Sequence, residues 1–423
     1  MKTCFCTPIP SGRISTNGKL EIRVAAKALD NVTIRISQNG SLLKEEGPFK
    51  AAADLQETKI YPDLKGIIGT IDLTVEFHDA AGQAIGSESF PYEVVASDVH
   101  STCLLDGCWV SIYHWSNAEA RYFNPGLKKL TDDGWRQTVR SMHKIGITSI
   151  LIQNVFDSPY YAYQHEMTAD KYDGLAFYPS KIYPQRMELA AHDPIEAILS
   201  EADKCDMAVF PGVGLYAWFD FSPESLKWHE RVTTELWERY GHHKSLYGWY
   251  LSEEMMGDLY YGYDPVPDEK YKDIAPFFAE YKKFVHELTP TKPVAMAPDN
   301  VKMQVYRKQW LPILSNIDIL IPFAFARTEN NVAEIAKLCA ETNTHFWVDM
   351  EIFANPFDNG LAPKTYEDLI KEIHNYDVLE QVYGYQYTGL MNEPGHRNNV
   401  GGPKTEDLYV KYEAYQEKVR RLK

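Results

Sequence analysis

The sequence predicts an α/β protein in which a (β/α)8 TIM barrel follows a small N-terminal β-sandwich of immunoglobulin-like type. Residues 1–100 alternate apolar and polar residues in short runs, as half-buried antiparallel strands do. From about residue 104, nearly continuous apolar runs alternate with helical patterns, which is typical of parallel strands buried on both faces. The length of 423 residues fits one barrel and one small domain. We therefore expect domains at 1–100 and 101–423.

The N-terminal part contains four runs that read as strands, at 20–24, 32–36, 71–77 and 89–95. Turn sequences separate them, including Asn39-Gly40. Short strands with regular turns favour a sandwich. Nothing in this part looks catalytic, so we expect it to be a spacer, a packing partner or a weak binding module.

Eight strand–helix units follow. Strands are expected at 108–113, 147–152, 207–213, 246–251, 293–297, 318–321, 345–349 and 382–386. Helices are expected near 131–145, 193–205, 223–240, 275–288, 301–314, 329–342, 364–375 and 405–421. Capping signals at Thr131, Asp193-Pro194 and Ser222-Pro223 support the first three helices. A doubly wound sheet is the alternative, but no glycine-rich phosphate loop follows the first strand.

Composition excludes several classes of function. The net charge of −16 disfavours nucleic acid and anionic membranes as partners. The sequence contains no run of 18 apolar residues, so no membrane span is expected. No apolar signal-peptide core is visible near the N-terminus. Localisation therefore stays unknown: we expect a cytoplasmic protein from the sequence as written, and a periplasmic or secreted one if a signal has been removed.

A metal or cofactor is not expected. Six cysteines lack zinc-finger spacing and are too few for a disulfide scaffold. His242-His243 precedes the fourth strand, on the end of a barrel that serves stability, and adjacent histidines do not easily share one ion.

The loops that follow the strands are where a barrel builds its active site. Amide, aromatic and charged residues gather at these positions, and His114, Gln153, Ser252 and Asp299 are among them. We expect substrate contacts from Trp115, Asn154, Tyr216, Trp218, Asn300, Arg327, Asp349, Gln386 and Tyr387. Such a set suits a neutral polyhydroxylated ligand, and the lack of an Arg/Lys cluster argues against phosphosugars. Packing remains open for the aromatic residues, and loop hydrogen bonds remain open for the amides.

Two glutamates end the fourth and seventh strands. Glu254 closes the run that begins at Tyr247, and Glu351 closes the run that begins at His345. Two facing carboxyl groups are the minimal equipment for cleaving a glycosidic bond. One of them must keep a proton near neutral pH, and Trp249, Tyr250 and Glu253 are neighbours that favour this for Glu254.

The segment Gly-Trp-Tyr-Leu-Ser-Glu-Glu at 248–254 resembles the acid/base motif of clan A retaining glycoside hydrolases, in which a second Glu ends strand seven. The barrel is particularly similar to an incompletely characterised family of glycosidase-like barrels common in Bacteroidetes. The resemblance covers residues 105–423. It implies that Glu254 is the acid/base and Glu351 the nucleophile, and that no cofactor is needed. Glu253 stands where the clan has Asn, so Glu253 remains an alternative acid.

The expected function is therefore an O-glycoside hydrolase, retaining in mechanism, that acts on a poly- or oligosaccharide. The alternative is a catalytically silent carbohydrate-binding protein on the same scaffold, because fold alone does not guarantee activity. Asn392-Glu393-Pro394 also reads like an acid/base motif. It follows the eighth strand, so we expect a loop turn with an exposed, non-catalytic Glu393.

Overall fold

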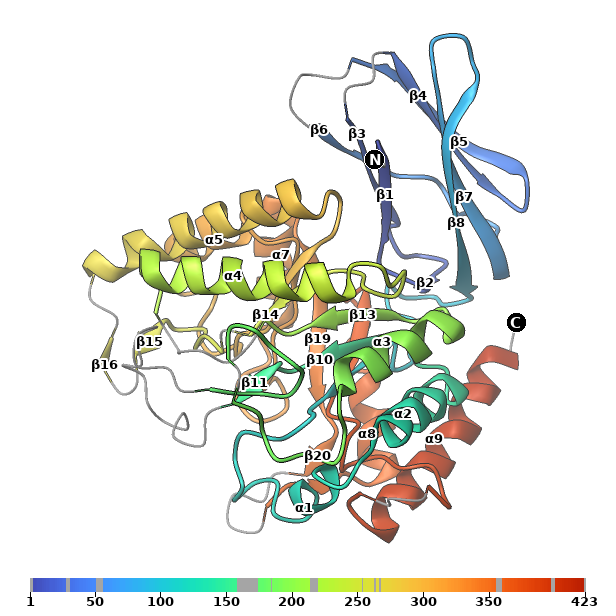
Figure 1. Ribbon diagram of the computed structural model, residues 1–423. Coiled ribbons are helices and arrows are strands. Elements are labelled where there is room, and N and C mark those ends of the chain that lie inside the picture. The colour runs from blue at the N-terminus through green and yellow to red at the C-terminus, as the bar shows by residue number, and fades with distance from the viewer. Residues whose placement is uncertain are drawn as a thin grey trace.

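The computed structural model describes residues 3–27, 31–50, 56–157, 174–183, 185–213, 220–252, 254–261, 264–265, 268–354, 360–396 and 400–421. Figure 1 shows two parts, a β-rich N-terminal part in blue and a barrel ringed by helices. Within the described residues, no helix has the length and apolar character needed to cross a bilayer.

The N-terminal part contains two sheets that share one core. Its strands are β1 (Cys4–Ile9), β2 (Arg13–Ser15), β3 (Glu21–Ala26), β4 (Val32–Gln38), β5 (Ser41–Phe49), β6 (Gln56–Ile60), β7 (Gly69–His78) and β8 (Ala84–Val95). The sheet orders are β1-β3-β6 and β2-β8-β7-β4-β5. Val24 of one sheet and Ile34 and Phe77 of the other belong to the same buried cluster. Two sheets around one core fit a sandwich, while the immunoglobulin-like topology and the boundary at residue 100 stay predictions.

The predicted parallel barrel is confirmed. Its strands are β9 (Gly107–Val110), β10 (Ser149–Ile152), β13 (Ala208–Pro211), β14 (Trp249–Leu251), β17 (Val294–Met296), β18 (Ile319–Leu320), β19 (His345–Glu351) and β22 (Gln381–Tyr385). They form one eight-stranded sheet in the order β13-β10-β9-β22-β19-β18-β17-β14. Parallel bridges from Val209 to Leu246 and from Gly212 to Tyr250 link the two ends of this order, near β13 and β14. The ring of strands is thereby nearly closed.

Helices surround this sheet, as Figure 1 shows. They are α1 (Asn124–Leu127), α2 (Asp132–Lys144), α3 (Pro194–Cys205), α4 (Pro223–Tyr240), α5 (Asp268–Leu288), α6 (Arg307–Leu314), α7 (Val332–Thr342), α8 (Tyr366–Ile373) and α9 (Pro403–Arg421). Short strands decorate the loops: β11 (Phe156–Asp157), β12 (Leu175–Ala176), β15 (Tyr260–Tyr261), β16 (Asp264–Pro265), β20 (Phe353–Ala354) and β21 (Ala362–Pro363). The predicted caps hold, because Thr131, Asp193 and Ser222 each accept a backbone N–H of the helix that follows.

The sixth helix, α6, begins later than the predicted 301. The backbone N–H of Val301 is bound by the Asp299 carboxylate, and Lys302 has a left-handed φ of 55°. An α-helix cannot pass through such a residue. Residues 301–306 therefore form turns, and α6 starts at Arg307.

Aromatic side chains from the strands pack together in the barrel interior. Trp109, Tyr250, Trp347 and Tyr383 belong to one buried cluster that Ile9 of β1 joins from the N-terminal part. Alternate residues of a strand point to the same side. Glu351 therefore shares the inward face of Trp347 on β19, whereas Glu254 lies beyond the end of β14. This alternation tells which face is inward, a choice that the apolar strand sequences alone leave open.

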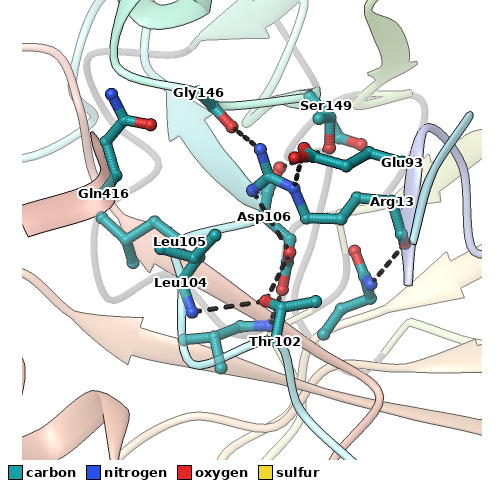
Figure 2. A network of polar contacts seen from close by, with 12 residues as sticks. Arg13, Glu93, Thr102, Leu104, Leu105, Asp106, Gly146, Ser149 and Gln416 are labelled. Carbon is teal, nitrogen blue, oxygen red and sulfur yellow. Dashed lines mark hydrogen bonds and ion pairs between the residues drawn. The ribbon is translucent and has the colours of Figure 1, made fainter. Parts of the chain in front are cut away.

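Buried charges fasten the N-terminal part to the barrel. Figure 2 shows Arg13 of β2 bound to Glu93 at 3.0 Å and to the carbonyl oxygen of Gly146 at 2.6 Å. The same guanidinium lies 3.5 Å from Asp106, directly before β9. A second ion pair joins Arg23 of β3 to Asp318, directly before β18, at 2.8 Å. Of the expected roles, these contacts favour that of packing partner.

Candidate active site

Charged side chains from four neighbouring strands meet at the carboxyl end of the barrel. Glu254 follows β14, Asp299 follows β17, Arg327 follows β18, and Asp349 and Glu351 lie on β19. The charge of Arg327 acts on Glu351, Glu254 and Asp299. The two glutamates that the sequence singles out therefore belong to one electrostatic cluster around a single guanidinium.

Glu351 is held by Arg327. The glutamate is only 4% exposed, and Arg327 Nε and Nη2 lie 2.6 and 2.5 Å from the same oxygen, Oε1. Burial acts to lower the pKa of Arg327, but its hydrogen bond to Glu351 and the surrounding carboxylates raise it overall. The guanidinium is thus a fixed positive charge directly beside the Glu351 carboxyl group.

The carboxyl group of Glu254 lies in a different environment from that of Glu351. Its side chain keeps some contact with solvent, but its carboxyl group is surrounded by protein. Burial raises the pKa of this group to about 8, and the charges of Glu119 and Asp299 add to the shift. Glu254 therefore carries its proton at neutral pH, as a general acid must.

Glu119 and Asp299, which shift the pKa of Glu254, were not among the neighbours expected to do so. Trp249 points away from the barrel interior, and its indole N–H binds Thr289 Oγ1. Glu253 lies outside the described residues. Asp299 stands at a strand end, whereas Glu119 comes from the loop after the first strand, which sequence spacing does not place. The position of Asp299 at a strand end marks it as a candidate in the sequence. No sequence feature marks Glu119 in this way.

Asp349 has a deeply buried carboxyl group. The residue is 6% exposed, and its Oδ1 has no hydrogen-bond partner among the described residues. Burial together with the charges of Glu351 and Glu254 holds the pKa of Asp349 well above its ordinary value. Its predicted place beside Glu351 is where the structure puts it, with a polar atom left to bind a ligand.

Strands one, two and eight supply a polar wall. Burial lowers the pKa of His114 to about 4, so the ring is neutral at pH 7. His114 Nδ1 contacts the backbone of Ser116, and His114 Nε2 lies 3.1 Å from the Tyr385 hydroxyl. Tyr385 in turn donates to Gln153 Oε1 at 3.3 Å. The sequence analysis places Tyr385 in strand eight but does not predict it as a site residue. In the structure it continues the inward face of Tyr383.

Trp115 lies at the edge of this wall. It is half-buried and stacks on His114, with ring centroids 5.6 Å apart. A partly accessible indole beside the polar wall fits its predicted role as a sugar contact. Tyr216 and Trp218, the two other predicted aromatic contacts of this kind after strand three, lie outside the described residues.

Several residues that the sequence predicts as ligand contacts pack against or hydrogen-bond other residues of the protein. Tyr387 is 2% exposed and packs in the cluster between barrel and helices, which favours the packing alternative, and its sugar contact stays a prediction. The fully buried Asn300 amide donates to Glu329 O and Asn331 and accepts from Thr328. Asn300 therefore holds loops together, which favours the alternative of loop hydrogen bonds over a hydroxyl contact.

The two other predicted amides also serve loops. Asn154 donates to Phe156 O in its own loop at 2.5 Å, but its Oδ1 has no hydrogen-bond partner among the described residues, so its ligand contact stays a prediction. Gln386 is fully buried, accepts from the Ser111 hydroxyl and donates to the carbonyl oxygen of Thr388, which favours the loop alternative over the predicted ligand contact. Gln153, one residue before Asn154, is the amide that reaches the polar wall.

Glu393 lies away from this cluster. Its carboxylate accepts from Ser141 at 2.5 Å and pairs with Lys144 at 2.9 Å, both on the outer helix α2. The Asn-Glu-Pro sequence is thus a structural loop, although Glu393 is half-buried rather than exposed.

Comparisons with known proteins agree with this architecture. Residues 105–398 match the family model described as "Domain of unknown function (DUF4434)". No curated protein matches the sequence. A protein named as a putative alpha-L-fucosidase from Bacteroides thetaiotaomicron VPI-5482 superimposes with a TM-score of 0.55 at 16% identity, over 74% of this chain and 93% of that one. At this identity the likeness shows a shared fold.

Two further solved structures align more loosely. The GH2 beta-galacturonidase from Eisenbergiella tayi gives a TM-score of 0.42 at 11% identity, over 99% of this chain and 72% of that one. The Parabacteroides merdae beta-glucuronidase gives 0.41 at 11% identity, over 98% of this chain and 52% of that one.

Proposed function

This chain belongs to the DUF4434 family, and we propose that it is a glycoside hydrolase that cleaves O-glycosidic bonds of a poly- or oligosaccharide. The observation that supports this most is the opposite treatment of two glutamates in one cluster. Glu254 is kept protonated by burial and neighbouring carboxylates, while Glu351 is paired with Arg327. One acid and one anion around a shared site are what glycoside hydrolysis requires.

The proposed mechanism is a retaining double displacement. Arg327 occupies Oε1 of Glu351, so Oε2 is the oxygen that attacks the anomeric carbon. As the glycosidic C–O bond breaks, the Glu254 proton passes to the leaving oxygen. In the second half, the Glu254 carboxylate takes a proton from water. The water oxygen attacks the anomeric carbon, and the bond to Glu351 breaks. The two steps consume one water and restore both side chains.

The remaining groups of the cluster have supporting roles in this proposal. Asp299 and Glu119 keep the proton on Glu254 through their negative charge. Asp349 offers a carboxyl oxygen to a sugar hydroxyl, since that atom has no partner among the described residues. Trp115 supplies an apolar ring face for the sugar.

One observation favours the alternative of a silent carbohydrate-binding protein. Two nitrogens of Arg327 bind Glu351, and so strong a pair opposes attack by the carboxylate. The two functions separate cleanly in one experiment, because a silent protein binds a sugar whose glycosidic bond it leaves intact.

The test is hydrolysis of a panel of aryl glycosides and polysaccharides, with product anomers followed by NMR. We expect net retention and a loss of turnover of at least about a hundredfold in Glu351→Gln. Glu393→Gln is the matched control, because Asn392-Glu393-Pro394 also reads like an acid/base motif but its glutamate binds outer helix α2. Binding without turnover by the wild-type chain, or unchanged turnover in Glu351→Gln, would contradict the proposal.

A further inference from the structure

Two histidines and a glutamate converge at the opposite end of the barrel from Glu254 and Glu351. His242 and His243 lie in the turn between α4 and β14, and Glu196 lies in the first turn of α3. Among the described residues, these three place one ligand atom each within 4.8 Å of one another. The two rings have centroids 4.1 Å apart and planes inclined by 38°. The turn thus brings adjacent histidines together, contrary to the expectation from their spacing.

His243 is fixed in orientation by two carboxylates. Its Nδ1 lies 2.6 Å from Asp203 Oδ2, and its Nε2 lies 3.0 Å from Glu196 Oε2. Asp203 is itself held, because its other oxygen accepts the backbone N–H of Ser245 at 2.8 Å. A carboxylate that binds one ring nitrogen and aims the other at a shared point is the arrangement that supports metal-ligating histidines.

The cluster is also accessible. His243 is buried, Glu196 is half-buried and His242 is exposed. Both histidines line a cavity of about 670 Å³ between the barrel and the N-terminal part. An ion in this cavity therefore reaches both histidines, and water can complete its coordination. The neighbouring Lys244 is engaged by Asp206 at 2.5 Å, so its charge is partly neutralised.

We propose that Glu196, His242 and His243 form a binding site for a divalent transition metal ion, with zinc as the ion that this donor set suits. Two imidazoles and one carboxylate with an open fourth position are a known zinc donor set, whereas magnesium and calcium prefer oxygen donors. Binding releases the hydrogen on His243 Nε2 to solvent, and a bond from Nε2 to the metal replaces the contact with Glu196. The metal joins α3 to the end of α4, far from the glutamate pair, and its role is to stabilise the fold. This proposal does not depend on the proposed hydrolase activity.

Isothermal titration of the full, tag-free chain with Zn²⁺ tests the site. We expect one Zn²⁺ per chain, and no comparable binding of Mg²⁺. His242→Ala should weaken binding at least about tenfold, and Asp203→Asn about tenfold to a hundredfold through lost orientation of His243. His143→Ala, an exposed histidine on α2, is the control and should bind as the wild type does.

The exposed position of His242 keeps this test independent of folding. Zinc should also raise the unfolding midpoint of the wild type and of His143→Ala by the same amount, and that of His242→Ala by less at the same zinc concentration. Absence of saturable Zn²⁺ binding by the wild type would overturn the proposal. So would equal affinity in the wild type, His242→Ala and Asp203→Asn.

Discussion

Substitution of Glu254 by glutamine should make the protein more stable at alkaline pH. Glutamine is nearly isosteric with a protonated glutamate but never ionises. In the wild type, the folded protein holds the Glu254 proton because burial and the charges of Glu119 and Asp299 disfavour the anion. At high pH the folded wild type must hold Glu254 as a buried anion, which lowers its free energy of unfolding. The variant has no such anion.

The magnitude follows from the shift in pKa from 4.5 to about 8. Below pH 4.5 the carboxyl is protonated in the folded and unfolded states, and its stabilising effect is fully present. Between pH 4.5 and 8 only the folded state keeps the proton, so stability falls as pH rises and the loss is complete above pH 8. At about 1.4 kcal/mol per pKa unit, the full difference is about 5 kcal/mol.

Urea unfolding of both proteins at pH 4.5, 6, 7.5 and 9 measures this difference. We expect a small gap at pH 4.5 that widens to about 5 kcal/mol at pH 9 in favour of Glu254→Gln. Glu393→Gln should show no alkaline gain: burial opposes ionisation of Glu393, but hydrogen bonds from Ser141 and Lys144 lower its pKa overall. A gap between wild type and Glu254→Gln that is the same at pH 4.5 and pH 9 would refute the raised pKa.

Three further predictions concern activity and stability. On any substrate found, kcat/KM should fall as pH rises through about 8, because the acid Glu254 then loses its proton; a rate that stays level to pH 10 would exclude that role. Arg327→Met leaves the buried Glu351 carboxylate without its counter-ion and should cost about 3–5 kcal/mol in urea unfolding, so a change below 1 kcal/mol would contradict the ion pair. Arg13→Met should cost a similar amount by stranding buried Asp106 next to Glu93, and an unaltered unfolding midpoint would argue against the fastening role of this network.

Local chemistry explains why most of the fold was predictable. Capping residues such as Thr131 and Ser222 act within a few residues of the helix start, so their sequence signal suffices. Continuous apolar runs likewise mark strands buried on both faces. The start of α6 was not predictable, because it depends on a hydrogen bond from Val301 to Asp299 and on the left-handed Lys302.

The candidate site was predictable in position but not in orientation. Strand-end placement was enough to find Glu254, Glu351, Arg327 and Asp349. Which aromatic residues face inward was hidden, because both faces of these strands are apolar; Tyr385 lies on the site wall, and Tyr387 packs outside the barrel. Groups supplied by long loops, such as Glu119, depend on tertiary structure that sequence spacing does not fix.

The most direct test of the glutamate pair is mass spectrometry of the trapped glycosyl-enzyme. The wild-type chain would be incubated with a 2-fluoro aryl glycoside of whichever sugar it hydrolyses and then digested. Our account predicts one sugar residue on the peptide that contains Glu351, and no adduct in Glu351→Gln. An adduct on another residue would contradict the assignment of Glu351, as would turnover of the natural glycoside with inversion and no adduct.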